Sequence, residues 1–189
     1  MQATVPVERL ESDDWLVRSF EVLDHVEAVM VARLLAGHAS FLRRLAVLFD
    51  RLGNGWFYAL FVPALMVWGG PARWRFVTVA ALSLALSFTI YPALKRRLRR
   101  IRPCHADPQL DSGVAPLDLY SCPSGHTMTA TAFHIPLVVA FPVLLPAAAV
   151  IWTLIAWSRL SLGHHYPTDV ILGACVGAAI ALQLTAMIL

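Results

Sequence analysis

The chain has 189 residues, of which 58% are hydrophobic and 14% charged, and its formal net charge is +3. Soluble domains typically carry about 25% charged residues, so this composition argues against a water-soluble globule. The length suffices for one domain and is short for two. We therefore expect one largely apolar unit that lies in a membrane.

The N-terminal region carries more charge than the rest of the chain. Residues 1–19 are polar and acidic and are expected to form a loose terminus. Apolar residues recur with a helical period from Phe20 to Gly37, and again from Ser40, a favoured helix start, to Leu52. Both segments are too charged to cross a membrane. They suit helices that lie in the membrane interface or, equally, helices that pack on other protein. No cleavable signal peptide is expected.

Four later stretches contain no Asp, Glu, Lys or Arg. They lie between Arg51 and Arg73, between Arg75 and Lys95, between Asp118 and Arg159, and after Asp169. A helical span needs roughly 20 apolar residues. Each stretch holds one span, except that the third holds two, because Pro142 and Pro146 interrupt it. We predict an all-α integral membrane bundle of about five transmembrane helices, with residues 1–54 as an N-terminal tail with interfacial helices and residues 55–189 as the membrane domain.

The order of these spans brings three polar clusters to one side of the membrane. The second span ends at Lys95 and the third begins near Ser124, so these two residues face the same side. The fourth span ends near Arg159 and the fifth begins near Asp169. Two crossings return the chain to the side that it left, so all three clusters are expected to meet at one face.

The first cluster is the basic run from Lys95 to Pro103. If the second span continues as a helix until Pro103 ends it, Lys95 and Arg102 lie two turns apart on one face. Two aligned cations suit the oxygens of a phosphate group, which arginine can bind in bidentate fashion. A basic run by itself is more typical of a stop-transfer signal or a headgroup-binding patch.

The second cluster, Pro123-Ser124-Gly125-His126, opens the third span. Free backbone N–H groups and the dipole at a helix start bind phosphate, and Gly125 lets an anion approach closely. His126 lies where it could exchange a proton with a bound group. The same four residues also describe an ordinary capped helix that carries a polar histidine.

The third cluster contains Arg159, a further cation, followed by His165 and Asp169. The four-residue spacing lets a helix or tight turn bring the Asp169 carboxylate to the His165 ring. A carboxylate on one imidazole nitrogen orients the ring and leaves the other nitrogen free to attack. We find neither the clustered carboxylates of a metal phosphatase nor the Gly-x-Ser-x-Gly elbow of a serine hydrolase. We expect no metal ion and no other cofactor.

Together the three clusters resemble the signature of the type 2 phosphatidic acid phosphatase superfamily, which also contains the vanadium haloperoxidases. That signature consists of Lys, six residues and Arg-Pro; then Pro-Ser-Gly-His; then Ser-Arg, five residues, His, three residues and Asp. Residues 95–103, 123–126 and 158–169 match every position and both fixed spacings. The N-terminal 50 residues contribute little to the resemblance.

The resemblance implies a metal-independent lipid phosphatase with defined residue roles. His165 would attack phosphorus and form a phosphohistidine, and Asp169 would orient His165. His126 would protonate the leaving oxygen and then activate water. The oxyanions would be held by Lys95, Arg102, Ser124, Gly125 and Arg159.

Several substrates and one non-enzymatic role are compatible with the resemblance. Haloperoxidases of the superfamily are soluble and much larger, so the spans argue against that activity. The resemblance favours undecaprenyl diphosphate as substrate, with phosphatidylglycerophosphate or phosphatidic acid as the alternative. A lipid-binding or transport protein on the same scaffold is a further alternative, against which the intact His126, His165 and Asp169 argue. The expected partners are the bilayer and a membrane lipid phosphate, with no nucleic acid; the oligomeric state stays open.

Two features of the sequence indicate opposite sides of the inner cell membrane for the site. Lysine and arginine are concentrated on the side of the three clusters, which the positive-inside rule places in the cytoplasm. Cys104 and Cys122 bracket the loop between the first two clusters, and a disulfide there would require an oxidising compartment; two unpaired thiols fit the sequence equally well. The resemblance to phosphatases that recycle lipid carriers at the outer face leads us to expect an extracytoplasmic site.

Overall fold

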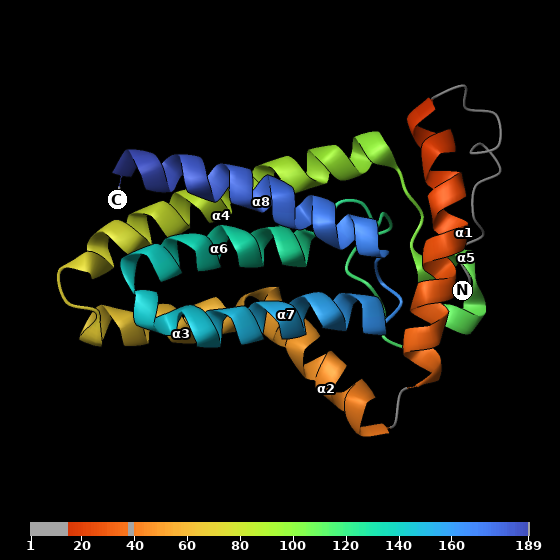
Figure 1. The fold of residues 1–189 in the computed structure, drawn as a ribbon, viewed down its shortest axis with the longest axis horizontal. Coiled ribbons are helices and arrows are strands. Elements are labelled where there is room, and N and C mark those ends of the chain that lie inside the picture. Colours follow the sequence, from red (N-terminus) through yellow and green to blue (C-terminus); the bar gives the residue numbers. More distant parts are fainter. Residues whose placement is uncertain (1–14, 38–39, 189) are drawn as a thin grey trace.

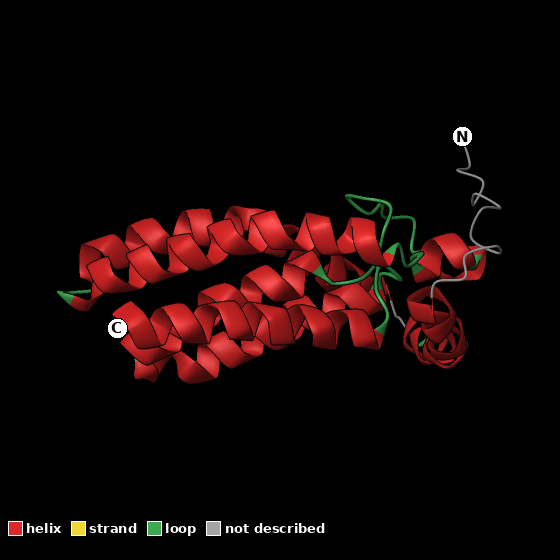
Figure 2. Cartoon of the chain, turned by 90° about the horizontal axis from the view of Figure 1, so that it is seen from above, coloured by secondary structure: helices red, strands yellow, loops and turns green. Residues whose placement is uncertain are grey.

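Residues 15–37 and 40–188 are described by a computed structural model, in which every regular element is a helix (Figures 1 and 2). In chain order these are α1 (Trp15–Ala36), α2 (Ser40–Arg51), a π-helical segment (Leu52–Trp56), α3 (Phe57–Trp68), α4 (Ala72–Leu98), α5 (Pro103–Ala106), α6 (Gly125–Ala140), α7 (Leu145–Ser161) and α8 (Pro167–Ile188), with 3₁₀ turns at Pro108–Leu110 and Pro142–Leu144. The predicted all-α class is confirmed.

Helices α3, α4, α6, α7 and α8 run along one another, and α1 crosses one end of this bundle (Figure 1). Ser40 begins α2, as predicted. The helix α1 begins at Trp15, earlier than the predicted start at Phe20. Residues 15–19 therefore belong to the helix instead of a loose terminus, because the apolar residues before Phe20 continue its pattern. The rest of that expected terminus lies outside the described residues.

Among the described residues, three helical segments are long and apolar enough to cross a membrane: Ala72–Leu98, Pro142–Ser161 and Pro167–Ile188. Helices α3, with 12 residues, and α6, with 16, are apolar but shorter. One cause of the short α3 is Gly55, whose φ of 111° interrupts the helix that leads out of α2. Such a backbone conformation favours glycine. The membrane bundle is confirmed, and the count of five spans stays a prediction.

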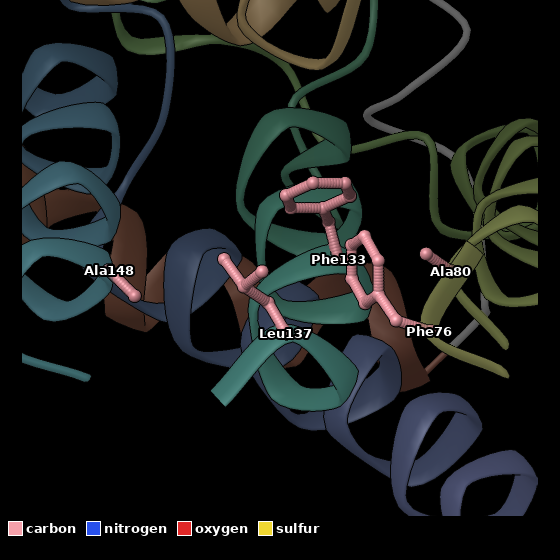
Figure 3. Close-up of a cluster of buried hydrophobic side chains, with 5 residues drawn as sticks. All are labelled: Phe76, Ala80, Phe133, Leu137 and Ala148. Atoms are coloured by element: carbon pink, nitrogen blue, oxygen red, sulfur yellow. The ribbon is translucent and has the colours of Figure 1, made fainter. Parts of the chain in front are cut away.

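The central helix of the bundle is α6, which contacts α4, α7 and α8. Figure 3 shows the core cluster, in which Phe133 and Leu137 of α6 lie among Phe76 and Ala80 of α4 and Ala148 of α7. The rings of Phe76 and Phe133 meet edge to face with centroids 5.4 Å apart, an arrangement that aromatic quadrupoles favour. Helix association in a membrane depends on close packing of this kind, so the cluster positions α6 relative to its neighbours.

Two glycines one turn apart, Gly173 and Gly177, let α8 approach α6 closely. A Cβ on Gly173 would lie 2.5 Å from the Ser124 carbonyl oxygen, and a Cβ on Gly177 would meet the carbonyl oxygen of Met128. Small residues four apart are typical of close helix contacts in membranes. The contact also positions the start of α8, where the Ser124 N–H donates to the Asp169 carbonyl oxygen at 3.0 Å.

Replacing Gly177 by alanine should push α8 away from α6, because the added Cβ meets backbone instead of a flexible side chain. Overpacking of this kind costs about 1–3 kcal/mol. We expect a lower melting temperature for the purified protein in detergent, measured by size-exclusion chromatography after heating. Ala179→Leu is the matched control, because Ala179 lies on the exposed face of the same helix. A Gly177→Ala protein as stable as this control would contradict the close approach.

Candidate active site

The three sequence clusters meet at the end of the bundle that α1 crosses (Figure 1). They contribute to the lining of one cavity of about 600 Å³. The predicted site residues in this lining are Lys95, Arg102, Gly125, His126, Arg159 and His165. Two further predicted residues, Ser124 and Asp169, are fully buried behind it. The structure thus brings six of the eight residues to one cavity and places the other two in its supporting layer.

The basic run does not continue α4 to Pro103, in contrast to the prediction. The helix ends directly before Arg99, which adopts a left-handed conformation (φ 49°) and donates its N–H to the Lys95 carbonyl oxygen at 2.9 Å. The chain then leaves the helix, and Pro103 begins the short α5 instead of ending α4. Lys95 and Arg102 therefore converge because the chain turns, and not because they share a helix face.

Arg102 reaches the loop between α7 and α8 and Arg100 reaches the first turn of α8, since alternate side chains of an extended segment point the same way. Arg102 Nη1 donates to the His164 carbonyl oxygen at 2.6 Å and to His165 Nε2 at 3.1 Å. Arg100 Nη1 donates to Asp169 Oδ1 at 2.7 Å. Neighbouring guanidinium groups thus hold the two members of the predicted His–Asp pair.

His165 is buried and neutral. Burial, followed by the charges of Arg102 and Arg159, lowers the pKa of His165 well below its ordinary value. Its Nε2 accepts the hydrogen bond from Arg102, and because a guanidinium only donates, the ring proton lies on Nδ1. That nitrogen faces Asp169 Oδ2 at 3.6 Å, slightly longer than a hydrogen bond, and the same oxygen accepts from the Tyr166 N–H at 2.8 Å. The arrangement leaves an unprotonated Nε2 in the cavity wall.

Pro123-Ser124-Gly125-His126 starts α6, as predicted, but Ser124 interacts with the helix instead of the cavity. Its Oγ accepts from Thr127 Oγ1 at 2.9 Å and caps the helix by accepting from the Thr127 N–H. Its own backbone N–H donates to the Asp169 carbonyl oxygen. Of the two residues in this cluster expected to bind phosphate, only Gly125 lines the cavity.

Asp50, in the last turn of α2, was not predicted from the sequence. Its buried carboxylate forms an ion pair with Arg159 and lies 3.9 Å from His126 Nε2. A Cβ on nearby Gly53 would come within 2.6 Å of the His126 ring. The N-terminal region therefore forms one wall of the site, and the expected boundary after residue 54 falls within Leu52–Trp56. A lone acid in an amphipathic helix is normally interpreted as part of the solvated face, so the sequence offered no signal for Asp50.

Arg100 was also not predicted from the sequence. It is fully buried, and besides Asp169 it binds two acids of α1: Nε donates to Asp24 Oδ1 at 2.8 Å and Nη2 donates to Glu27 Oε2 at 2.6 Å. The basic run contains five arginines, and no local pattern shows which one is buried. The acids that pair with Arg100 come from a helix more than 70 residues away along the chain.

Cys104 and Cys122, the possible disulfide pair, are both free and buried in this structure, and their pairing stays a prediction. The backbone N–H of Cys104 donates to the Gly163 carbonyl oxygen at 2.9 Å, and burial raises the pKa of its thiol to about 11. Burial, together with the charge of Asp169, raises the pKa of the Cys122 thiol above its ordinary value. The side of the membrane that holds the site stays a prediction.

A membrane-spanning helical bundle whose end carries a neutral histidine among fixed cations has the arrangement of an enzyme that transfers an anionic group. Among the described residues, no group of three or more His, Cys, Asp or Glu side chains is arranged to hold a metal ion. The model of the PAP2 superfamily matches residues 76–189, more than half of the chain. The chain belongs to the PAP2 superfamily.

Similar proteins include named lipid phosphatases. The decaprenylphosphoryl-5-phosphoribose phosphatase of Mycolicibacterium smegmatis is 35% identical over 151 residues, which are 78% of this chain and 80% of the relative. The lipid A 1-phosphatase of Rhizobium johnstonii is 38% identical over 101 residues, which are 50% of this chain and 40% of the relative.

Two solved structures share the fold. A transmembrane PAP2-type phosphatidylglycerolphosphate phosphatase from Bacillus subtilis aligns with a TM-score of 0.66 at 20% identity, over 95% of this chain and 89% of its own. Aquifex aeolicus LpxE aligns with a TM-score of 0.62 at 17% identity, over 83% of this chain and 93% of its own. With the family match and the named relatives, the protein is a membrane lipid phosphatase, which sets aside the non-catalytic alternative.

Glu27 connects α1 to the start of α8, and a substitution of Glu27 tests whether this contact between the two helices stabilises the fold. Glu27 accepts from the Thr168 N–H at 2.9 Å and from Thr168 Oγ1 at 2.8 Å, in addition to its ion pair with Arg100. Glu27→Gln should leave buried donors short of acceptors, which costs about 1–3 kcal/mol, so we expect a lower melting temperature in detergent. Asp107→Asn removes the same charge from an exposed position and should have little effect. Equal melting temperatures would show that the α1 contact does not stabilise the fold.

Proposed function

We propose that this lipid phosphatase hydrolyses a phosphate monoester on a polyprenyl-linked lipid and that His165 forms a phosphohistidine intermediate. The observation that carries the mechanism is that the buried His165 lines the cavity and that its Nε2 accepts a hydrogen bond from Arg102 Nη1 at 3.1 Å. A neutral imidazole nitrogen can attack phosphorus because its lone pair is not protonated. The position of Asp169 next to Nδ1 supports the assignment of Asp169 as the orienting carboxylate.

The reaction proceeds in two steps. Nε2 of His165 attacks phosphorus, the bond from phosphorus to the ester oxygen breaks, and His126 donates a proton so that the lipid leaves as an alcohol. Asp169 stabilises the positive charge that develops on the His165 ring. Water then attacks the phosphohistidine while His126 takes up its proton, and the N–P bond breaks to release inorganic phosphate. The carboxylate of Asp50 lies 3.9 Å from His126 Nε2, where its negative charge partly offsets the burial and the neighbouring cations that favour the neutral ring.

Three cations in the cavity lining are assigned to the phosphate oxygens: Lys95, Arg102 and Arg159. Fixed positive charge in a buried site stabilises the charge that spreads over these oxygens in the transition state. Gly125, which also lines the cavity, allows the phosphate to approach the start of α6. The cations take the part that a metal ion plays in other phosphatases, so the proposed mechanism requires no divalent ion.

The choice of a polyprenyl-linked substrate is supported by the relative from Mycolicibacterium smegmatis, whose name specifies a polyprenyl-linked phosphoribose. The cavity extends from the cations to Phe88, Tyr91 and Leu117, which suit the apolar part of a lipid. Undecaprenyl diphosphate, favoured by the sequence resemblance, is the second candidate. The observation that favours it is Arg96, a further cation in the cavity lining that suits a second phosphate group.

The substrate proposal is tested by phosphate release from the purified protein in detergent with EDTA. The panel contains a polyprenyl-linked phosphoribose phosphate, undecaprenyl diphosphate, phosphatidylglycerophosphate and phosphatidic acid. We expect the highest kcat/KM for the first compound and no loss of activity in EDTA, because fixed cations supply the positive charge. The highest value for undecaprenyl diphosphate would support the second candidate. A preference for a glycerolipid, or strict dependence on added magnesium, would contradict the proposal.

His165→Ala should lower turnover by more than about 10³-fold, as for other covalent nucleophiles, while substrate binding persists because the cations are intact. With substrate labelled in its phosphate, wild type quenched in alkali should retain label on the protein, and the variant should not. His25→Ala is the control, because His25 lies on the exposed face of α1. Turnover within tenfold of wild type would remove His165 as the nucleophile.

We propose the inner cell membrane as the location, with the site at its extracytoplasmic face. The resemblance to lipid-carrier phosphatases supports this side. The opposing positive-inside argument is weakened because Arg100 and Arg102 are buried in the site, where they serve its structure. In a cysteine-free background, Gln109→Cys at the site end should react with an impermeant maleimide in intact cells, and Arg75→Cys at the opposite end only after lysis. The reverse pattern would place the site in the cytoplasm.

A further inference from the structure

The carboxylate of Asp118 binds the cations that the proposed mechanism assigns to the substrate phosphate. Both of its oxygens accept from Lys95 Nζ at 2.8 Å, and Oδ1 also accepts from Arg102 Nη2 at 2.7 Å. Burial alone would raise the pKa of Asp118, but the hydrogen bonds and charges of Lys95 and Arg102 lower it below its ordinary value. The carboxylate is therefore ionised at neutral pH. Asp118 lines the same cavity as His165, so an anion of the chain itself lies where the substrate anion is expected.

Both cations have other contacts that hold them when the Asp118 carboxylate leaves. Arg102 Nε donates to the backbone carbonyl oxygen of Asp118 at 2.8 Å, and its Nη1 donates to that of His164 at 2.6 Å. Lys95 Nζ lies 5.6 Å from the centroid of the Tyr91 ring, within the range of a cation–π contact. A departing carboxylate thus frees donors on both cations without releasing the guanidinium. These contacts favour an exchangeable anion over a fixed structural support.

The segment that carries Asp118 lies where the lipid part of a substrate can reach it. The side chain of Asp118 is 40% exposed, so its carboxylate can turn towards solvent. The flanking Leu117 is 74% exposed and Leu119 is 45% exposed. Leu117 also lines the cavity together with Phe88 and Tyr91. Apolar contacts with these residues give a lipid substrate a binding free energy that a soluble phosphate lacks.

We infer that Asp118 is a built-in competitor of the substrate phosphate, which weakens the binding of every phosphate so that only a ligand with apolar contacts of its own binds well. Every incoming phosphate must displace its carboxylate from Lys95 and Arg102. Inorganic phosphate and soluble esters displace the carboxylate through their charge alone. A lipid phosphate also makes apolar contacts, whose binding free energy offsets the cost of displacing the carboxylate. The inference rests on the phosphate site of the proposed function. The experiment distinguishes a failure of the Asp118 role from a failure of that phosphate site.

The test compares wild type with Asp118→Asn as purified full-length protein in detergent. The inhibition constant of orthovanadate should fall about tenfold, because charge-assisted contacts of the carboxylate no longer have to be broken. For p-nitrophenyl phosphate, kcat/KM should rise about tenfold through a lower KM for the same reason. For a lipid phosphate, kcat/KM should rise by a similar factor, because its phosphate has to displace the same carboxylate, whereas turnover at saturating lipid should change by less than about threefold. Asp118→Ser, which also removes the charge, should show the same pattern.

Asp111→Asn is the matched control, because it removes the same charge from the same loop. The Asp111 carboxylate accepts from the Gly113 N–H at 2.8 Å, and its replacement should leave the constants for vanadate and both substrates unchanged. Weaker vanadate inhibition in both Asp118 variants would show that the carboxylate positions the cations, and unchanged inhibition would show that it does not compete. Either result overturns the inference.

Lys95→Ala checks the phosphate site independently. Vanadate inhibition at least about tenfold weaker than in wild type is expected from the loss of one charged contact and supports that site. If Lys95→Ala weakens inhibition while the Asp118 variants do not strengthen it, only the role of Asp118 is overturned. If Lys95→Ala leaves inhibition unchanged, the assignment of the phosphate site itself is overturned.

Discussion

The buried guanidinium of Arg100 is the contact on which the geometry of the site depends. It joins α1, through Asp24 and Glu27, to the first turn of α8, through Asp169. A buried charge is tolerated when it is paired and fully hydrogen-bonded, so each partner restricts the positions of the others. Asp169 in turn faces His165. The orientation of the proposed nucleophile is thus linked to a helix that crosses the end of the bundle.

Helix packing acts on the same turn of α8 from the other side. Gly173 and Gly177 bring α8 against α6, and the N–H of Ser124 holds the carbonyl group of Asp169. The backbone of Asp169 is therefore fixed by α6 while its carboxylate is fixed by Arg100. This double attachment explains why Ser124 lies behind the cavity wall: its polar groups connect two helices, and Gly125 forms the wall in its place.

The N-terminal helices belong to the functional unit, although the family match begins only at residue 76. Asp50 of α2 pairs with Arg159 and lies near His126, and Glu27 of α1 binds both Arg100 and Thr168. Removing charged partners from buried groups of this kind is strongly destabilising. The proposed site therefore includes residues from both sides of the expected division after residue 54, which itself stays a prediction.

The lengths of the apolar stretches were enough to predict the membrane-bundle class and the meeting of three clusters at one end, and local spacings such as that of His165 and Asp169 were enough to predict the pairs within the clusters. The sequence could not show that α4 ends before Arg99, since a left-handed non-glycine residue has no local signal. Which charged residues face the cavity and which support it depends on the folded chain, because a charge can be buried only where distant helices supply its partners, as the acids of α1 do for Arg100.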